Sequence, residues 1–449
     1  MRRINSRQVD MLNGPLAGKI VRFALPLAAS SVLQQLFNAA DLAVIGRFEN
    51  STAMAAVGSN AAIVGLMVSL FGGLSLGTNV LVAALIGQNR REKIGDAVHT
   101  SIAMAFLSGI LIWLLGLVLA PVILRAISTP DEVLPLASLY LRIYFGAMPF
   151  MLVYDFGSSV LRAKGDSGRP LRVLMISGML NVVLNLYFVG ACHLSVAGVA
   201  IATVISNILS AVLVLDFLGH EEEAFRFSFR KLRISAREAK RIIAIGAPAG
   251  LQGMVFNISN VVVQSGVNSF GADCIAGNTA AQNFEYMAYF VIFAFAQTAT
   301  TFTSQNFAAG KYDRCRKVYL LTTMIGFSAT FAVSMLFYGF RNTLIQIFTT
   351  DPGVIVYAFA RFRYIGNMEL LTGTYEISGG CLRGRGHSVI PMVITMIGSC
   401  AFRLIWIATF FQSHHTIENL LIIYPISWVL SGIAMNIALA MDVRRVYAG

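Results

Sequence analysis

The sequence predicts an all-α polytopic membrane protein with twelve transmembrane helices in two six-helix lobes. The first observation is composition: of 449 residues, 56% are hydrophobic and only 12% are charged, whereas soluble chains carry about 25% charged residues. The mean hydropathy is +0.70. Disorder is excluded, because it needs low hydrophobicity and high charge. A soluble enzyme of this length is disfavoured, because so few charges would not cover its surface.

The second observation is the spacing of the apolar stretches, since a membrane-spanning helix needs about 20 apolar residues. The clearest stretch, FLSGILIWLLGLVLAPVIL at 106–124, contains no charge. Membrane barrel strands need only 9–11 alternating residues, so the length of the stretches excludes a barrel. In chain order the predicted spans are 20–45, 56–86, 96–124, 133–160, 171–191, 195–218, 242–268, 276–306, 315–339, 354–380, 389–411 and 418–441.

The third observation is the distribution of positive charge. The net charge is +12, and Lys and Arg are retained preferentially on the cytoplasmic side of membrane proteins. If the N-terminus is cytoplasmic, that side carries 27 Lys and Arg residues and the opposite side carries six. This asymmetry predicts that both termini are cytoplasmic, and it supports an even number of spans. It also explains the basic 219–241 loop without a nucleic-acid partner.

The chain repeats itself after about 220 residues. The distance from Pro26 to Asn38 equals the distance from Pro248 to Asn260, which is twelve residues in both cases. Three further matches follow in the same order: GSNAA at 58–62 with GNTAA at 277–281, QN at 88–89 with QN at 305–306, and LRAKGDS at 161–167 with LRGRGHS at 382–388. Parallel repeats of this kind are typical of transporters. We therefore predict lobes at 1–218 and 242–449, joined by a cytoplasmic loop at 219–241.

Asp41 is the foremost candidate for a functional residue, because an ionisable side chain near the bilayer centre costs about 2.5–3.5 kcal/mol on insertion scales. Gln34, Asn38 and Asp41 share one helical face at i, i+4 and i+7. A carboxylate among amide and hydroxyl oxygens suits a proton or a small hard cation such as Na+. The alternative is that the polar residues only join helices by hydrogen bonds. The predicted ion-coupling set is Asp41, Asn181, Asn185 and Thr203.

The second lobe carries a different set of polar residues, together with many aromatic ones. Beside a carboxylate and several amides, aromatic rings could hold a flat organic cation by cation–π contact, although aromatic stripes are usually packing. Asp155 and Glu376 occupy equivalent repeat positions and could instead pair with Arg162 and Arg383. Arg403 could partner a carboxylate. The predicted substrate-binding set, drawn from both lobes, is Gln34, Asn38, Gln252, Asn257, Gln282, Glu285, Tyr286 and Glu376.

Cysteine and histidine give no sign of a cofactor or of catalysis. The five Cys are scattered and form neither a CxxC pair nor a metal-binding spacing, and the six His form no HExxH motif. An intramembrane enzyme is therefore disfavoured, and we expect no cofactor other than a coupling ion. The polar and basic N-terminus also lacks the pattern of a cleaved signal peptide.

The chain resembles the multidrug and toxic compound extrusion (MATE) transporters over nearly its whole length, most closely the bacterial DinF-like branch. Residues 38–41 (NAAD), 56–59 (AVGS), 161–166 (LRAKGD), 280–285 (AAQNFE) and 382–384 (LRG) carry the resemblance, with Pro26, Asn181 and Asn185. It implies a V-shaped bundle of two lobes, alternating access, and export of organic cations or other xenobiotics in exchange for H+ or Na+.

The resemblance also implies roles for single residues. Asp41 matches the coupling aspartate of the first span, and Glu285 matches a family glutamate of span 8. Asn185 stands where some relatives carry Asp, and Phe256 where some carry Glu. We expect a monomer in the bacterial inner membrane that carries a drug-like, cationic small molecule and binds no nucleic acid.

A flippase for lipids or polysaccharide precursors is the alternative function, since it shares a helical bundle with a cavity. Such a protein would be expected to line its cavity with cations that bind phosphate. The predicted cavity positions here hold acids, amides and aromatic rings, which favours cationic or neutral cargo. The sequence leaves open the cargo, the choice between H+ and Na+, and the stoichiometry.

Overall fold

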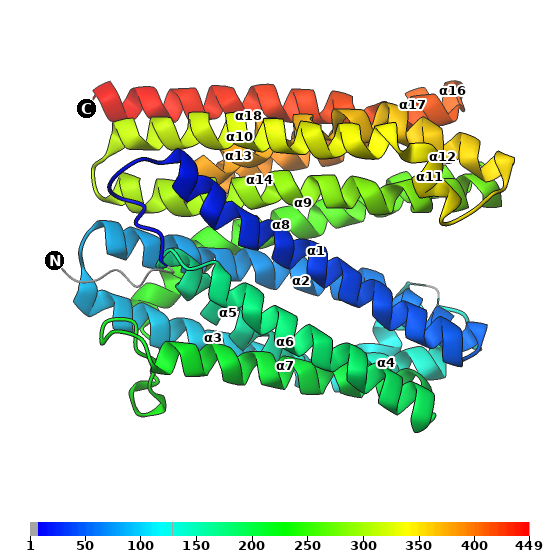
Figure 1. The fold of residues 1–449 in the computed structure, drawn as a ribbon, viewed down its shortest axis with the longest axis horizontal. Helices are drawn as coiled ribbons and strands as arrows, with labels where there is room; N and C mark the ends of the chain where they lie inside the picture. Colours follow the sequence, from blue (N-terminus) through cyan, green and yellow to red (C-terminus); the bar gives the residue numbers. More distant parts are fainter. Residues whose placement is uncertain (1–7, 128, 449) are drawn as a thin grey trace. The chain divides into compact units, whose positions relative to one another are not determined.

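The computed structural model describes residues 8–127 and 129–448, and within them every regular element is a helix (Figure 1). Arg2, Arg3 and Arg7, which were counted as cytoplasmic charges, lie outside the described residues, as does the beginning of the stretch examined for a signal peptide. The described part confirms the predicted all-α class.

The first repeat forms six helical segments that match the predicted spans. Two of them are irregular: α4 and α5 meet at a bend of 46°, and α6 continues into the π-helical turn η1. The bounds are α1 Ala17–Phe48, α2 Ser51–Gly87, α3 Arg91–Ala126, α4 Leu134–Phe145, α5 Met148–Ala163, α6 Gly168–Asn185, η1 Leu186–Ala191 and α7 Ser195–Gly219.

The second repeat follows a connecting segment that contains the short helix η2 (Phe229–Lys231). Its fourth and fifth spans are interrupted by a 3₁₀ segment, η3, and by a π-helical segment, η4. The bounds are α8 Ala236–Asn268, α9 Ala272–Ala308, α10 Tyr312–Gly339, α11 Arg341–Gln346, α12 Pro352–Tyr364, η3 Gly366–Leu371, α13 Thr372–Gly384, α14 Val389–Thr395, η4 Met396–Ala401, α15 Phe402–Ala408, α16 Phe410–Ser413, α17 Ile417–Leu421 and α18 Ile423–Ala448.

Twelve spans result when these segments are read together. Within the described residues, nine helices are long and apolar enough to cross a membrane, and the bent α4–α5 pair is a tenth. The other two are α9, which is long but polar over much of its length, and α12–η3–α13, which is broken into short pieces. The largest difference from a predicted terminus is at the last span, predicted to end at 441 and ending at Ala448.

The chain forms two compact units, and each takes a helical segment from the other repeat. The first unit contains Ala29–Ala247 with Gln8 and Val9, and the second contains Asp10–Ala28 and Pro248 onward. The chain thus passes between units inside α1 and inside α8. Both helices carry an interior proline near that point, Pro26 and Pro248. A proline removes one backbone hydrogen bond of the helix.

Each unit packs around one central helix. In the first unit α5 contacts α2, α3 and α7, and in the second unit α9 contacts α10, α12 and α13. One face of α3 is apolar but exposed. It is formed at helical spacing by Leu107, Leu111, Leu114, Val118 and Val122. Such a stripe is expected where a helix faces lipid, which agrees with a membrane protein.

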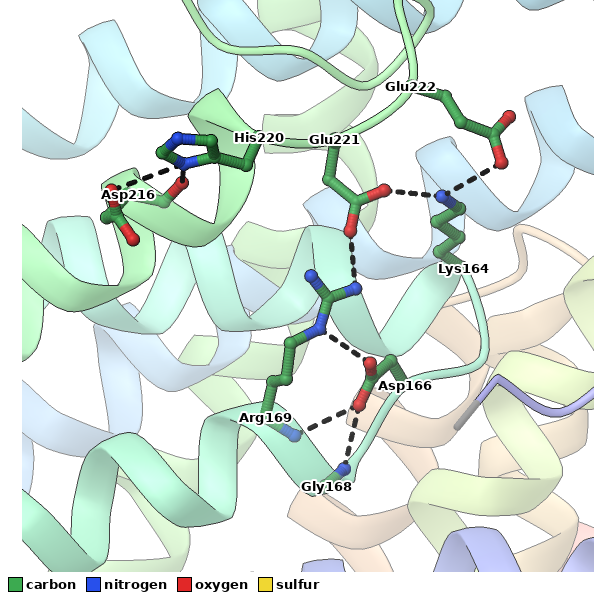
Figure 2. A network of polar contacts seen from close by, with 8 residues as sticks. All are labelled: Lys164, Asp166, Gly168, Arg169, Asp216, His220, Glu221 and Glu222. Carbon is green, nitrogen blue, oxygen red and sulfur yellow. Dashed lines mark hydrogen bonds and ion pairs between the residues drawn. The ribbon is translucent and has the colours of Figure 1, made fainter. Parts of the chain in front are cut away.

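The loop between α5 and α6 is closed by a network of buried charges in the first unit (Figure 2). Figure 2 shows Glu221, just after α7, between Lys164 and Arg169. Lys164 Nζ donates to Glu221 Oε2 at 2.5 Å, and Arg169 also pairs with Asp166 at 2.6 Å. Burial raises the pKa of Glu221, but the hydrogen bonds and charges of Lys164 and Arg169 outweigh it and hold this pKa below its ordinary value.

The second repeat closes the equivalent loop with an equivalent pair. Arg385 Nη1 donates to Asp442 Oδ2 at 2.7 Å, and both residues lie 221 positions after Lys164 and Glu221. The loop glycines correspond as well, since Gly165 has φ +100° and Gly386 has φ +92°. The internal repeat therefore extends from the sequence motif to the charge pair and to the backbone of the turn.

Candidate functional site

Asp41 lies on α1 against α6, and Asn185 is its direct partner. Asn185 Nδ2 donates to Asp41 Oδ1 at 2.5 Å and also lies 3.3 Å from Asn181 Oδ1. The contact between these helices is close because Gly178 leaves room for Phe37, whose ring would lie 1.9 Å from a Cβ at that glycine. Three residues of the predicted coupling set are thus brought together in one unit.

The amide oxygen of Asn185 is a hydrogen-bond acceptor that stays free, at a point where the helix changes its geometry. Asn185 is the last residue of α6 before the π-helical turn η1, and π-turns recur at functional sites because they change the direction of side chains. Its amide oxygen Oδ1 is buried without a hydrogen-bond partner. A carboxylate beside an unpartnered amide oxygen can take up a proton or contribute to the oxygen shell of a small cation.

For the other predicted residues of the first lobe, the structure shows no hydrogen bond to Asp41. The hydroxyl of Thr203 donates to the carbonyl of Val199 in its own helix at 3.0 Å. Gln34 and Asn38 are exposed on α1. Two residues of α4 that the sequence analysis did not select, Tyr140 and Tyr144, stack with their ring centroids 5.8 Å apart.

In the second lobe the predicted residues fall into separate hydrogen-bonded groups. Gln252 donates to Thr395 at 3.1 Å and accepts from Arg383 Nη2 at 3.0 Å. Glu376 accepts from the hydroxyl of Tyr289 at 3.2 Å.

Two further predicted residues of this lobe contact each other, and a third lies on a neighbouring helix. Gln282 donates to the hydroxyl of Tyr286 at 3.0 Å, and both residues belong to α9. Asn257, on α8, is partly buried.

Glu285 has a partner that its local sequence does not reveal. Arg361, on α12, donates to both carboxylate oxygens of Glu285, at 2.7 and 2.9 Å, and to Asn278 at 2.6 Å. The signal that could have found this partner is the helical face of α12, where Val354, Ala358 and Phe362 are buried together with Arg361. The charge count instead placed Arg361 among the residues of the outer side.

The described residues contain no group of three or more His, Cys, Asp or Glu side chains that could hold a metal ion. A site for Na+ at Asp41 would therefore depend on amide, hydroxyl and carbonyl oxygens in addition to one carboxylate. Proton uptake needs only the carboxylate and its hydrogen-bond partners. The surroundings of Asp41 are therefore compatible with uptake of a proton and with binding of Na+.

Comparisons with known proteins agree over most of the chain. A family model described as MatE matches residues 26–187 and 248–409, so that the two matches begin at the interior prolines of α1 and α8. The chain is 26% identical to the probable multidrug resistance protein YoeA of Bacillus subtilis (strain 168), covering 91% of this chain and 90% of that protein. It is 27% identical to the probable multidrug resistance protein YpnP of the same strain, with 89% and 90% covered.

A solved structure shares the fold. The crystal structure of MATE in complex with MaL6 superposes with a TM-score of 0.92 at 20% identity, and the match covers 99% of this chain and 100% of that one. At this level of identity the likeness concerns the arrangement of the helices.

Proposed function

Since this chain belongs to the MatE family, the multidrug and toxic compound extrusion transporters, we propose that it is a secondary active antiporter. It exports organic cations or other xenobiotics in exchange for H+ or Na+ by alternating access, with both termini in the cytoplasm. The observation that carries the proposal is the Asp41–Asn185 pair, a carboxylate within a membrane span whose partner is a neutral amide.

The mechanism is competition for this carboxylate. When the transporter faces the cytoplasm, Asp41 is free of its ion and the protein accepts cargo. When it faces outward, H+ or Na+ binds Asp41, α1 adjusts near Pro26, and cargo leaves. When one ion is exchanged for an uncharged cargo molecule, the charge that enters down a potential of 100 mV yields about 2.3 kcal/mol, which supports a cargo gradient of roughly fortyfold.

The test is transport in proteoliposomes with separately imposed pH and sodium gradients. The wild-type protein is expected to drive ethidium against its gradient under one of the two conditions, and that condition identifies the coupling ion. Asp41→Asn is expected to abolish driven transport, because its amide neither takes up a proton nor offers a negative charge to a cation.

Asp216→Asn is the matched control, since Asp216 is a carboxylate of the same unit that lies exposed beside His220. It is expected to transport as the wild type does. Driven export by the Asp41→Asn variant at the wild-type rate, under either gradient, would show that the coupling residue is another one.

A further inference from the structure

The segment that connects the two repeats exposes large apolar side chains outside the membrane spans. Phe229, in the short helix η2, is 74% exposed, the highest value for a large apolar side chain among the described residues. Leu232 and Ile234 follow it and are 42% and 48% exposed. On a long apolar helix such exposure is expected toward lipid, but these residues lie in a connecting segment. Exposed apolar side chains that lie close together mark a surface that contacts a partner or a membrane.

Phe229 and Leu232 lie on the same side of the chain. Residues i and i+3 of a 3₁₀ turn lie one above the other, and the N–H of Leu232 donates to the carbonyl of Phe229 at 3.2 Å. Arg230 and Lys231 stand between them and are exposed. Among the described residues, neither of these two basic side chains takes part in an ion pair. The turn therefore presents apolar and cationic side chains together on the surface of the first unit.

This part of the chain is held on α3 at both of its ends. The N–H of Ser228 donates to His99 Nε2 at 3.1 Å, and the ring of Phe227 stacks on His99 with centroids 5.6 Å apart. The N–H of Ser235 donates to the hydroxyl of Thr100 at 3.0 Å. Because both acceptors belong to α3, the exposed side chains between them keep a fixed height along this helix.

That height corresponds to the level of the lipid headgroups. A hydrocarbon core spans about 20 residues of a helix, and counted back from Arg125 it reaches Ala105. Thr100 lies five residues before Ala105, which is about 8 Å along an α-helix. The headgroup region adds about 5–8 Å on each side of the core. The connecting segment therefore lies against the membrane surface at this point.

The charges of the segment select the kind of lipid. Anionic lipids of the cytoplasmic leaflet attract Lys and Arg side chains near the surface. An apolar side chain beside a cation inserts among the headgroups, while the long basic side chain extends to a phosphate. The carboxylate of Asp96, on the same part of α3, is already paired with Arg233 at 2.5 Å, so it does not oppose an anionic ligand.

We infer that residues 228–235 form a lipid-binding surface that takes anionic lipids of the cytoplasmic leaflet. Phe229 and Leu232 insert between the headgroups, and Arg230 and Lys231 bind the lipid phosphates. This surface goes beyond the proposed transport function. Only the choice of leaflet rests on the orientation proposed there.

The experiment places the environment-sensitive dye acrylodan at position 229 of the full-length protein in nanodiscs. The dye is attached to Phe229→Cys in a Cys192→Ala background, because Cys192 is exposed and the other four cysteines are buried. The nanodiscs contain phosphatidylcholine, either alone or with about one third phosphatidylglycerol. Emission is expected to move to shorter wavelength by about 20 nm with phosphatidylglycerol, because the dye leaves water for the headgroup region. The same dye on Glu223→Cys, an exposed position before the docked part, is expected not to respond.

Two double variants test the role of charge. Arg230→Gln with Lys231→Gln is expected to remove at least half of the shift, because each basic side chain at an anionic surface strengthens binding about fivefold. Arg90→Gln with Arg91→Gln is the matched control, since it removes two exposed positive charges from the beginning of α3. Arg91 lies nine residues before Thr100, about 14 Å further from the membrane, which exceeds a Debye length of about 8–10 Å. This control is expected to keep the shift.

The outcomes separate the lipid-binding surface from the proposed function. Equal emission of the dye at position 229 in the two kinds of nanodisc, or a full shift in the Arg230→Gln, Lys231→Gln variant, would overturn the surface. A docking surface for an acidic cytoplasmic protein would give the first of these results. Both faces of a nanodisc carry the same lipids, so the comparison does not depend on orientation. Asp41→Asn is expected to keep the shift while it loses driven export, and normal export by that variant would refute only the coupling proposal.

Discussion

At the scale of single residues, the membrane-embedded charges differ in how they are compensated. Asp41 has an amide partner, Glu285 has a guanidinium, and Arg403 has neutral groups and two aromatic rings. Since a charge in hydrocarbon is costly, each arrangement implies a different role. The closed Glu285–Arg361 pair is suited to holding α9 to α12, whereas the carboxylate of Asp41 is suited to exchanging an ion.

Arg361→Gln is expected to lower the stability of the protein substantially. It leaves Glu285 buried without its counter-charge, and removal of one partner of a buried ion pair costs about 3–5 kcal/mol. The double variant Arg361→Gln with Glu285→Gln removes both charges and is expected to recover most of that loss. Thermal unfolding in detergent, followed for the two single variants and the double variant, measures the coupling.

Arg363→Gln provides the control, because Arg363 is exposed on the same helix. Its effect is expected to stay within about 0.5 kcal/mol, as for most surface substitutions. A double variant as unstable as the sum of the two single variants would mean that the pair contributes no coupling energy.

The sequence predicted the partner of a buried charge only where both residues stand out as polar side chains in apolar spans. Asp41 and the Asn181–Asn185 face were selected because charges and amides are rare in apolar spans, and the structure brings them together. Arg361 was not connected with Glu285, because hydropathy gives no pairing between helices and the charge count had assigned Arg361 to the outer side. The functional roles of all these residues stay predictions.

At the scale of elements, the helices could be predicted well and the loops could not. Apolar length decides where a span begins and ends, which is why α1, α9 and α10 lie within a few residues of their predicted bounds. The bend between α4 and α5 and the breaks at η3 and η4 have no comparable signal. The repeated LRxxG loop was recognised as a motif in the sequence. Its ion pairs, Lys164 with Glu221 and Arg385 with Asp442, could not be predicted, because they depend on where the C-terminal ends of α7 and α18 lie.

Glu221→Gln is expected to destabilise the protein by about 3 kcal/mol at pH 7, because it leaves Lys164 and Arg169 without their shared carboxylate. A carboxyl group whose pKa is lower in the folded state stabilises the fold above its unfolded pKa of about 4.3. That contribution is lost as the pH falls through the lowered pKa. The melting temperatures of wild type and variant should therefore begin to converge as the pH falls below about 4.3, and should meet only below the lowered pKa of the folded state.

Glu222→Gln is the matched control. Glu222 also lies near Lys164, at 3.6 Å, but its side chain is 53% exposed. Its removal is expected to cost less than about 0.5 kcal/mol, as for exposed pairs. A difference between Glu221→Gln and wild type that stays constant from pH 7 to pH 3.5 would contradict a role for the ionised carboxylate.

The two loop glycines permit a comparison inside one molecule. Gly165→Ala and Gly386→Ala both place a side chain at positive φ, which costs about 1 kcal/mol. At Gly165 the added Cβ would also lie 2.3 Å from the carbonyl oxygen of Val9, whereas at Gly386 nothing lies within 4 Å. Thermal unfolding should show a larger loss for Gly165→Ala, by about 1–3 kcal/mol. Equal losses would show that the contact with Val9 does not persist in solution.

At the scale of the whole molecule, the compact units do not coincide with continuous halves of the chain. Asp10–Ala28 belongs to the second unit, and the contacts there are specific. Asn306 and Arg314 both donate to the carbonyl of Met11, at 3.1 and 3.2 Å, and Phe23 packs edge-on against Phe302. The predicted repeat boundary in the 219–241 loop divides the sequence, while the contacts exchange one helical segment in each direction.

A fragment of residues 229–449 expressed alone is expected to be unstable, because it lacks the segment 10–28 that satisfies Asn306 and Arg314. Co-expression with a fragment of residues 1–228 should restore a complex that survives purification, and a fragment of residues 29–228 should not. Recovery of monodisperse protein by size-exclusion chromatography is the measurement. Equal recovery with the two partner fragments would contradict a structural role for residues 10–28.

The exchange of α1 and α8 segments has a consequence for biosynthesis. Asp10–Ala28 leaves the ribosome first, but the unit that receives it begins only at Pro248. At a synthesis rate of roughly 5–20 residues per second, the earliest part of the chain waits roughly 10 to 45 s before the first of its partners exists. The C-terminal half of α1 waits for a shorter time, because its partner Asn185 on α6 is made before the second unit begins. The N-terminal half of α1 is therefore the part of this helix that stays longest without its final neighbours.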